Sequence, residues 1–146
     1  MSNESPAKDR LRVVFDTNIY ISTFLKSGFS RELFNLALLD KIDLFISRPI
    51  LGELQEKLRG KFHVKESDIK LFINTISEMA KIVSPTQKLK VIKGDPADNI
   101  ILECAQKAQA NLIVSLDRHL LKLKRYQNIG IVHPKTFSWI IFDGSR

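Results

Sequence analysis

The sequence predicts a single, doubly wound α/β domain, in which a central parallel sheet carries helices on both faces. Short apolar runs alternate with segments that repeat apolar residues at helical spacing, as in parallel strands joined by crossover helices. The first run ends abruptly in Asp16-Thr17-Asn18, which is typical of a buried strand that delivers polar side chains to the carboxyl edge of such a sheet. A length of 146 residues, 44% of them hydrophobic, suits one domain rather than two.

The N-terminal part of the chain predicts a tail, two strands and two helices between them. Residues 1–10 are polar and lack periodicity, so we expect a flexible tail there and a domain over 11–142. Ser27, Gly28 and Ser30 separate two stretches of helical spacing. The elements expected here are a strand ending at Phe15, helices over 19–26 and 31–39, and a strand over 43–47.

Capping signals position the elements of the middle part. Pro49 suits the first turn of a helix that Ser47 or its neighbour caps, and Gly60 ends that helix. Ser67 precedes a longer helix. The elements expected here are helices over 49–60 and from 68 to about 81, a strand over 82–85 and a basic connection over 88–93.

Asp95 and Pro96 suit the cap and the first position of the next helix. An apolar run over 112–115 is the clearest strand after the first, and it too is followed by a carboxylate, Asp117. The elements expected from here on are a helix body over 100–110, this strand, a short helix through 123, a strand over 130–132 and a terminal helix from Pro134.

The charge of the chain favours a polyanionic partner. Lys and Arg number 23 against 16 Asp and Glu, which gives a net charge of +7 and a pI of about 9.6. Nucleic acid is the leading candidate and a membrane surface the second. No apolar run approaches the roughly 20 residues that span a bilayer, so we expect a cytoplasmic protein. Cys104 lies within an apolar helical pattern and is interpreted as a packing thiol rather than a reactive one.

Four carboxylates lie beside strand ends or helix starts: Asp16, Glu53, Asp98 and Asp117. Because these ends share one edge of a doubly wound sheet, we expect the four acids to converge in one pocket. Each also has an ordinary explanation. Asp16 and Asp117 could cap the helices that follow them, Glu53 could be a solvated helix residue, and Asp98 could favour the positive end of its helix.

Like charges that converge cannot all stay ionised unless cations neutralise them. Oxygen ligands without His or Cys favour Mg²⁺ or Mn²⁺ over Zn²⁺, and the number of ions is left open. Such a site suits phosphodiester hydrolysis, because the metal lowers the pKa of a water molecule and neutralises charge on the leaving oxygen. The residues expected to orient carboxylates or waters, with helix capping as the alternative, are Thr17, Asn18, Ser47 and Ser115.

Basic residues follow two of the four acids and could hold a nucleic-acid backbone, although a solvated helix face is the ordinary alternative for each. The leading candidates are Lys57, Arg59, Lys61, Arg118 and Lys122. The three histidines share no spacing that predicts a common metal site. Only His119 is near a predicted acid and could contact phosphate, and His63 and His133 are interpreted as surface or structural residues.

At this point the residues resemble the PIN domain family, over about 11–140. The motifs that carry the resemblance are Asp16-Thr17-Asn18 after a strand, Glu53-Leu54 on a helix, Asp98 followed by Ile101 and Ala105, and Ser115-Leu116-Asp117 after a strand. The run Asp95-Pro96-Ala97-Asp98-Asn99 is similar to the toxin-like branch of bacterial and archaeal members.

The resemblance implies a PIN-like Rossmann-type fold and a Mg²⁺- or Mn²⁺-dependent endoribonuclease that cleaves single-stranded RNA, often as the toxin of a toxin–antitoxin pair. Asp16, Glu53, Asp98 and Asp117 would be its acidic quartet. The chain departs from the pattern at His119, where many relatives carry a further Asp that bears on a second metal position. The expected partners are therefore single-stranded RNA and an antitoxin protein, with a homo-oligomer as a further candidate and no membrane.

Two other classes of function remain open. A catalytically inactive PIN-fold module could bind nucleic acid or regulate without hydrolysis, and a metal titration that yields no Mn²⁺-dependent RNA product would indicate it. A phosphotransfer protein with an Asp nucleophile ranks lower, because the chain lacks the second Asp that haloacid dehalogenase-type phosphatases place two residues after the first.

Overall fold

A central sheet organises the protein. The computed structural model describes residues 10–26, 35, 37, 39–92 and 95–143, and within them six strands form one sheet in the order β3-β2-β1-β4-β6-β5. The strands are β1 (Arg12–Phe15), β2 (Asp43–Ser47), β3 (Lys81–Val83), β4 (Leu112–Val114), β5 (Arg125–Tyr126) and β6 (Ile129–Val132).

The two middle strands, β1 and β4, pair in parallel, with Val14 opposite Ile113. On its other side β1 pairs in parallel with β2, which pairs in parallel with β3. The chain therefore leaves β1 toward one edge of the sheet and leaves β4 toward the other. Such a reversal opens a crevice at the carboxyl ends of the two middle strands, where open α/β sheets bind ligands.

Strand β1 is apolar because both of its faces are covered. Val13, Val14 and Phe15 are completely buried, as expected for a middle strand of a parallel sheet that has helices on both faces. Strand β4 has the same character, with Ile113 and Val114 completely buried. The residues that follow these two strands are therefore held in fixed positions by the core beneath them.

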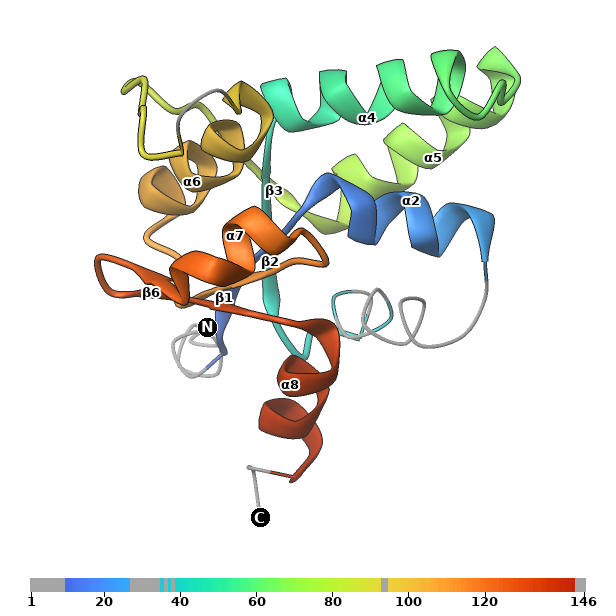
Figure 1. Cartoon of the computed structure of the whole chain (residues 1–146). Coiled ribbons are helices and arrows are strands. Elements are labelled where there is room, and N and C mark those ends of the chain that lie inside the picture. Colours follow the sequence, from blue (N-terminus) through green and yellow to red (C-terminus); the bar gives the residue numbers. More distant parts are fainter. Residues whose placement is uncertain (1–9, 27–34, 36, 38, 93–94, 144–146) are drawn as a thin grey trace.

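Helices lie on either side of the central strands (Figure 1), with α6 across β1 to β4 and α4 packed against α2 and α5. The helices are α2 (Thr17–Leu25), α4 (Arg48–Gly60), α5 (Glu66–Met79), α6 (Pro96–Ala108), α7 (Arg118–Leu123), α8 (Pro134–Ser138) and the π-helix η1 (Trp139–Asp143). The predicted α/β class, with a central sheet between helices, is confirmed.

The capping predictions for α4 and α6 are confirmed. Ser47 Oγ accepts a hydrogen bond from Ile50 N at 3.4 Å, and Asp95 Oδ1 accepts one from Asp98 N at 3.2 Å. The prediction for α5 is wrong by two residues at each end, because Lys65 is the N-cap and Ala80 the C-cap. The lysine offers no side-chain cap, so only the backbone marks where this helix begins.

The C-terminal part differs from the prediction in two ways. A short strand, β5, pairs antiparallel with β6, so the sheet is mostly rather than wholly parallel. The terminal helix is α8 followed by a π-helix, rather than one continuous α-helix. Both features are too short to produce a periodic pattern in the sequence.

Cys104 is completely buried, and burial raises the pKa of its thiol to about 12. This confirms its interpretation as a packing residue. The predicted tail lies outside the described residues apart from Arg10, as does most of the helix expected over 31–39, of which Asn35 and Ala37 are described and helical. No helix among the described residues is both long enough and apolar enough to cross a membrane.

One buried side chain fastens the segment before α6 to that helix. Asn99 Oδ1 accepts a hydrogen bond from Ile92 N at 3.0 Å, and Asn99 Nδ2 donates to Ile92 O at 2.8 Å and to Asp95 O at 3.2 Å. Only 6% of Asn99 is exposed, so the Ile92 groups that it satisfies have little access to water as a replacement.

We therefore predict that Asn99→Ala lowers the free energy of unfolding by about 2 kcal/mol, because it leaves partly buried backbone groups unpaired. Asn74→Ala is the matched control, since Asn74 is an exposed helical asparagine, and should change that free energy by no more than about 0.5 kcal/mol. Denaturant unfolding measures both. Equal effects of the two substitutions would contradict the assigned role of Asn99.

Candidate active site

The polar groups of the site gather at the carboxyl ends of the two middle strands. Asp16 follows β1, whereas Ser115 and Asp117 follow β4. The first turn of α6 brings Asp98 to the same edge, and α4 brings Glu53. Four elements from distant parts of the sequence therefore contribute to one site.

Ser115 joins the acids that follow β1 and β4. Its Oγ donates a hydrogen bond of 2.6 Å to Asp16 Oδ2 and accepts one of 2.9 Å from Asp117 N. Ser115 is completely buried, and only 5% of Asp16 is exposed. The serine therefore fixes one carboxylate oxygen of Asp16 and, at the same time, the backbone from which Asp117 projects.

Glu53 is attached to the same site through Thr17, the residue after Asp16. Thr17 Oγ1 donates a hydrogen bond of 2.9 Å to Glu53 Oε1. The second oxygen, Oε2, lies 3.6 Å from Lys57 Nζ, one turn further along α4. Glu53 is thus held on two sides, by a buried hydroxyl and by a partly exposed ammonium group.

Asp98 is the least satisfied acid of the site. Only 5% of it is exposed, and its Oδ2 has no hydrogen-bond partner among the described residues. A buried carboxylate oxygen without a partner is costly, because burial removes water that would otherwise solvate the charge. Such an atom at the carboxyl edge of the sheet is therefore suited to contacting a ligand.

The electrostatics show that three of the acids are close enough to affect one another. The pKa of Asp98 is raised to about 8, chiefly by burial and also by the Asp95 carboxyl and the charges of Asp117 and Asp16. Burial also raises the pKa of Asp16, against an opposing hydrogen bond from Ser115, and the charge of Asp117 contributes to the rise. A positive charge placed among these acids would relieve both effects.

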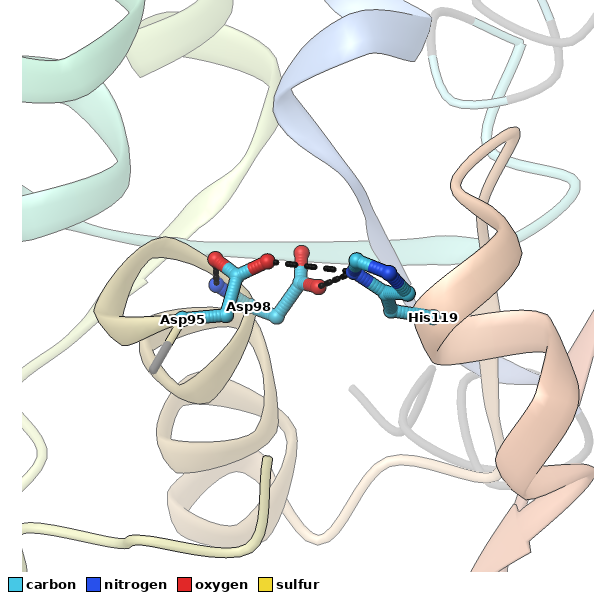
Figure 2. Close-up of side chains that lie close together, drawn as sticks. All are labelled: Asp95, Asp98 and His119. Carbon is cyan, nitrogen blue, oxygen red and sulfur yellow. Dashed lines mark hydrogen bonds and ion pairs between the residues drawn. The ribbon is translucent and has the colours of Figure 1, made fainter. Parts of the chain in front are cut away.

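Asp95 and His119 stand beside Asp98 (Figure 2). His119 Nδ1 lies 3.4 Å from Asp95 Oδ2 and 3.8 Å from Asp98 Oδ2. Burial opposes ionisation of Asp95, but hydrogen bonds with Asp98 and His119 outweigh it and lower the Asp95 pKa. One ligand atom from each of the three residues lies within 4.8 Å of the others.

The four acids predicted from the sequence are only partly brought together. Asp16, Asp98 and Asp117 interact through their charges, and Glu53 is joined to Asp16 through Thr17. In the described part of the chain, however, no three of these four acids have ligand atoms within 4.8 Å of one another. The quartet therefore lies at one edge of the sheet without forming a tight cluster.

The residues predicted to orient the acids divide into two groups. Thr17 and Ser115 contact Glu53 and Asp16, as described above. Ser47 instead caps α4 and hydrogen-bonds the Cys104 thiol, which is the ordinary alternative. The Asn18 side chain is exposed, and within the described residues no hydrogen bond joins it to the four acids. Asp117 combines both roles, because its Oδ1 also accepts a bond of 2.7 Å from His119 N.

The predicted basic residues differ in how free they are. Arg59 forms a two-pronged ion pair with Glu66, and Lys61 lies over the Phe62 ring at 5.5 Å. Lys57 is closer to the acids, since its charge lowers the pKa of Asp16. Arg118 and Lys122 are exposed on α7, the helix that follows Asp117. Lys57, Arg118 and Lys122 are therefore better placed to face a ligand at the site than Arg59 is.

Sequence reasoning missed Asp95 as a member of the site, and it gave His119 only as a residue that could contact phosphate. Asp95 was assigned only as a helix cap, yet its cap uses Oδ1 and leaves Oδ2 directed at His119. The spacing of three residues between Asp95 and Asp98 is a signal that both face one side of the helix start. For His119 the signal is its position two residues after Asp117, within the first turn of α7.

Comparisons with known proteins show what the chain is similar to. The family model described as PIN domain matches residues 12–119. The chain is 29% identical to an uncharacterised protein of Methanocaldococcus jannaschii over 141 residues, which cover 90% of this chain and 89% of that protein. The structure of this chain is similar to the crystal structure of VapBC2 from Rickettsia felis bound to a DNA fragment from their promoter, with a TM-score of 0.59. The similarity covers 83% of this chain and 97% of that chain, at 20% sequence identity.

The raised pKa of Asp98 makes stability depend on pH. Between the unfolded pKa of about 4 and the folded value of about 8, the folded protein keeps a proton on Asp98 that the unfolded chain has released. The free energy of unfolding that is due to Asp98 therefore falls as pH rises through this window. Asp95 stays ionised in both states above pH 5, because its folded pKa is lowered.

We predict that Asp98→Asn, which cannot titrate, increases the free energy of unfolding relative to the unchanged protein by more at pH 9 than at pH 5. Denaturant unfolding in the presence of EDTA measures the difference. Asp68→Asn serves as the control, because Asp68 is exposed on α5, and its effect should be the same at both pH values. An Asp98→Asn effect that is independent of pH would contradict the raised pKa.

Proposed function

Because the chain belongs to the PIN domain family, we propose that it is an endoribonuclease that requires Mg²⁺ or Mn²⁺ and cleaves single-stranded RNA. The family supports nuclease chemistry in general. The observation that carries the finer proposal is Asp98 Oδ2, a buried and unpartnered oxygen beside Asp16 and Asp117. No neutral small molecule would relieve the mutual repulsion of these carboxylates as a divalent cation does.

The donors of the site fit such a cation. Asp16, Asp98 and Asp117 offer carboxylate oxygens, the ligands that Mg²⁺ and Mn²⁺ prefer. Glu53 is joined to the same site by its hydrogen bond with Thr17. Mg²⁺ usually takes one or two carboxylates and completes its shell with waters and phosphate oxygens, so loosely spaced acids suit it. A divalent cation bound there would lower the pKa of a water molecule and offset the charge that develops on the phosphate.

The chain's own residues position these acids. The Ser115 hydroxyl engages Asp16 Oδ2 and leaves Oδ1 available for a ligand. Asp117 commits Oδ1 to the first turn of α7, which leaves its Oδ2 available as well. Thr17 likewise restrains Glu53. Asp16 and Asp117 are thus each anchored by one oxygen, and such outer contacts usually contribute 10- to 100-fold to metal affinity.

Basic side chains near the pocket would hold the RNA backbone. Arg118 and Lys122 are exposed on α7, and Lys57 lies on the α4 side. Together with the net charge of +7, they favour a polyanion whose binding weakens as salt is raised. Arg59 would contribute less, because Glu66 already neutralises it.

A protein partner of the antitoxin kind is a further part of the proposal. It rests on the similarity to VapBC2, which was crystallised with promoter DNA, and on the family resemblance of the run 95–99 to toxin-like members. Co-purification of this chain with the product of a neighbouring small open reading frame would support it, and activity unaffected by that product would contradict it.

The test of cleavage uses a fluorescently labelled, unstructured RNA, with Mn²⁺ or with EDTA. We expect Mn²⁺-dependent cleavage that Asp16→Asn and Asp98→Asn each reduce by at least about 100-fold, because each removes a charged ligand from the cation. Neither variant should lose the fold, since each also relieves repulsion among the acids in the metal-free protein.

Glu56→Gln is the matched control, because Glu56 is an exposed carboxylate on α4 whose charge acts on Arg59 rather than on Asp16 or Asp98, and it should keep full activity. Single-stranded DNA and duplex RNA of the same sequence test the substrate class. RNA binding without product under any metal would contradict the hydrolytic proposal and favour the inactive binding module. Cleavage that survives both Asp substitutions would reject the roles assigned to those acids.

A further inference from the structure

The most compact group of ligand atoms in the described residues is the one formed by Asp95, Asp98 and His119 (Figure 2). We propose that these three residues form a cation position of their own, beside the pocket of Asp16 and Asp117, which takes Mn²⁺ or another borderline divalent ion in preference to Mg²⁺. This proposal rests on the proposed function only because the two sites share Asp98.

Each member of the group has its backbone fixed and a ligand atom to spare. Asp95 uses Oδ1 to cap α6 and directs Oδ2 toward His119. The Asp117 carboxylate holds His119 N at 2.7 Å, which sets the start of α7 and leaves the imidazole ring directed at the acids. The ligand atoms thus come from two helices that are both anchored at their first turns.

An independent observation indicates that the group awaits a ligand. Asp98 Oδ2 is directed into the group, lies 3.8 Å from His119 Nδ1, and has no hydrogen-bond partner in the part of the chain that the structure describes. The residue is 95% buried, since its exposed fraction is 5%. Helix capping explains Asp95 on its own, but it does not explain a buried, unpaired oxygen that faces an imidazole nitrogen.

The spacing of the ligand atoms suits one ion. At a metal–ligand distance of about 2.1 Å, adjacent ligands of an octahedral ion lie about 3.0 Å apart and opposite ligands about 4.2 Å apart. The distances of 3.4 Å and 3.8 Å from His119 Nδ1 to the two carboxylates fall within this range. Only small side-chain shifts would be needed to bind an ion.

The charge balance also favours a cation. The N-terminus of α6 acts as about half a positive charge, which opposes a cation but offsets only a part of two carboxylates. His119 is two-thirds exposed, so turning its ring onto an ion breaks few other contacts. When both carboxyls are ionised, two acids and a neutral imidazole give a net negative site with one nitrogen ligand.

That nitrogen ligand determines the preference for the ion. Mg²⁺ is a hard cation that binds oxygen almost exclusively, whereas imidazole suits the divalent transition metals. The ordinary alternative is a protonated His119 that simply pairs with the two acids. That ion pair would place a proton where the proposed site places a metal, so the two can be told apart by spectroscopy.

The experiment adds Mn²⁺ alone to the full-length, metal-free protein and records pulsed electron paramagnetic resonance. We expect a coupling from one directly bound ¹⁴N nucleus, which His119→Asp abolishes while Mn²⁺ still binds. Calorimetric titration should also show that His119→Asp lowers the preference for Mn²⁺ over Mg²⁺ by at least about 10-fold, because it restores an all-oxygen ligand set. His63→Asn is the control, since His63 is exposed and has a positive φ of 53°, which Asn tolerates.

Bound Mn²⁺ without nitrogen coupling, or coupling that persists in His119→Asp, would overturn this site. Coupling that His63→Asn removes would overturn it as well. RNA cleavage is not among these readouts, so the proposed nuclease can stand while this site fails. Conversely, nitrogen coupling in a protein that cleaves no RNA would support the site and contradict the nuclease.

Discussion

Repulsion among carboxylates at the carboxyl edge of β1 and β4 is the interaction on which the rest of this structure depends. Asp16 and Asp98 are almost completely buried, burial raises the pKa of both carboxyls, and the negative charge of Asp117 raises both pKa values as well. A fold tolerates such an arrangement only where rigid elements hold the groups in place. Here the completely buried residues of β1 and β4 supply that rigidity, and Ser115 links the ends of the two strands.

The acids at two helix starts both cap their helices and contribute negative charge to the site. Asp95 and Asp117 each give one oxygen to the backbone of a first turn and keep the other oxygen for contacts within the site. The same residues therefore form the helices and present the charge. For this reason the capping interpretation and the functional interpretation of these acids, which are alternatives at the level of sequence, hold together in the structure.

The sequence was sufficient for those features that depend on neighbouring residues. Apolar runs ending in polar residues predicted β1, β2 and β4, and the Ser47 and Asp95 caps placed α4 and α6. It was not sufficient for contacts between distant segments. His119 meets Asp95 only because α6 and α7 start at the same edge of the sheet, 24 residues apart. Likewise, the ion pair with Glu66 that makes Arg59 less available to a ligand depends on the path of the chain from α4 into α5, which no local pattern specifies.

The most direct test of the central claim is the position of a bound ion. Anomalous diffraction from crystals grown with Mn²⁺ above pH 8, where Asp98 is ionised, locates the ion without reference to activity. We expect a peak at coordination distance from Asp98 that is also shared by Asp16 or Asp117. Carboxylates that pair with lysines or solvent instead, with no peak at Asp98, would contradict the account.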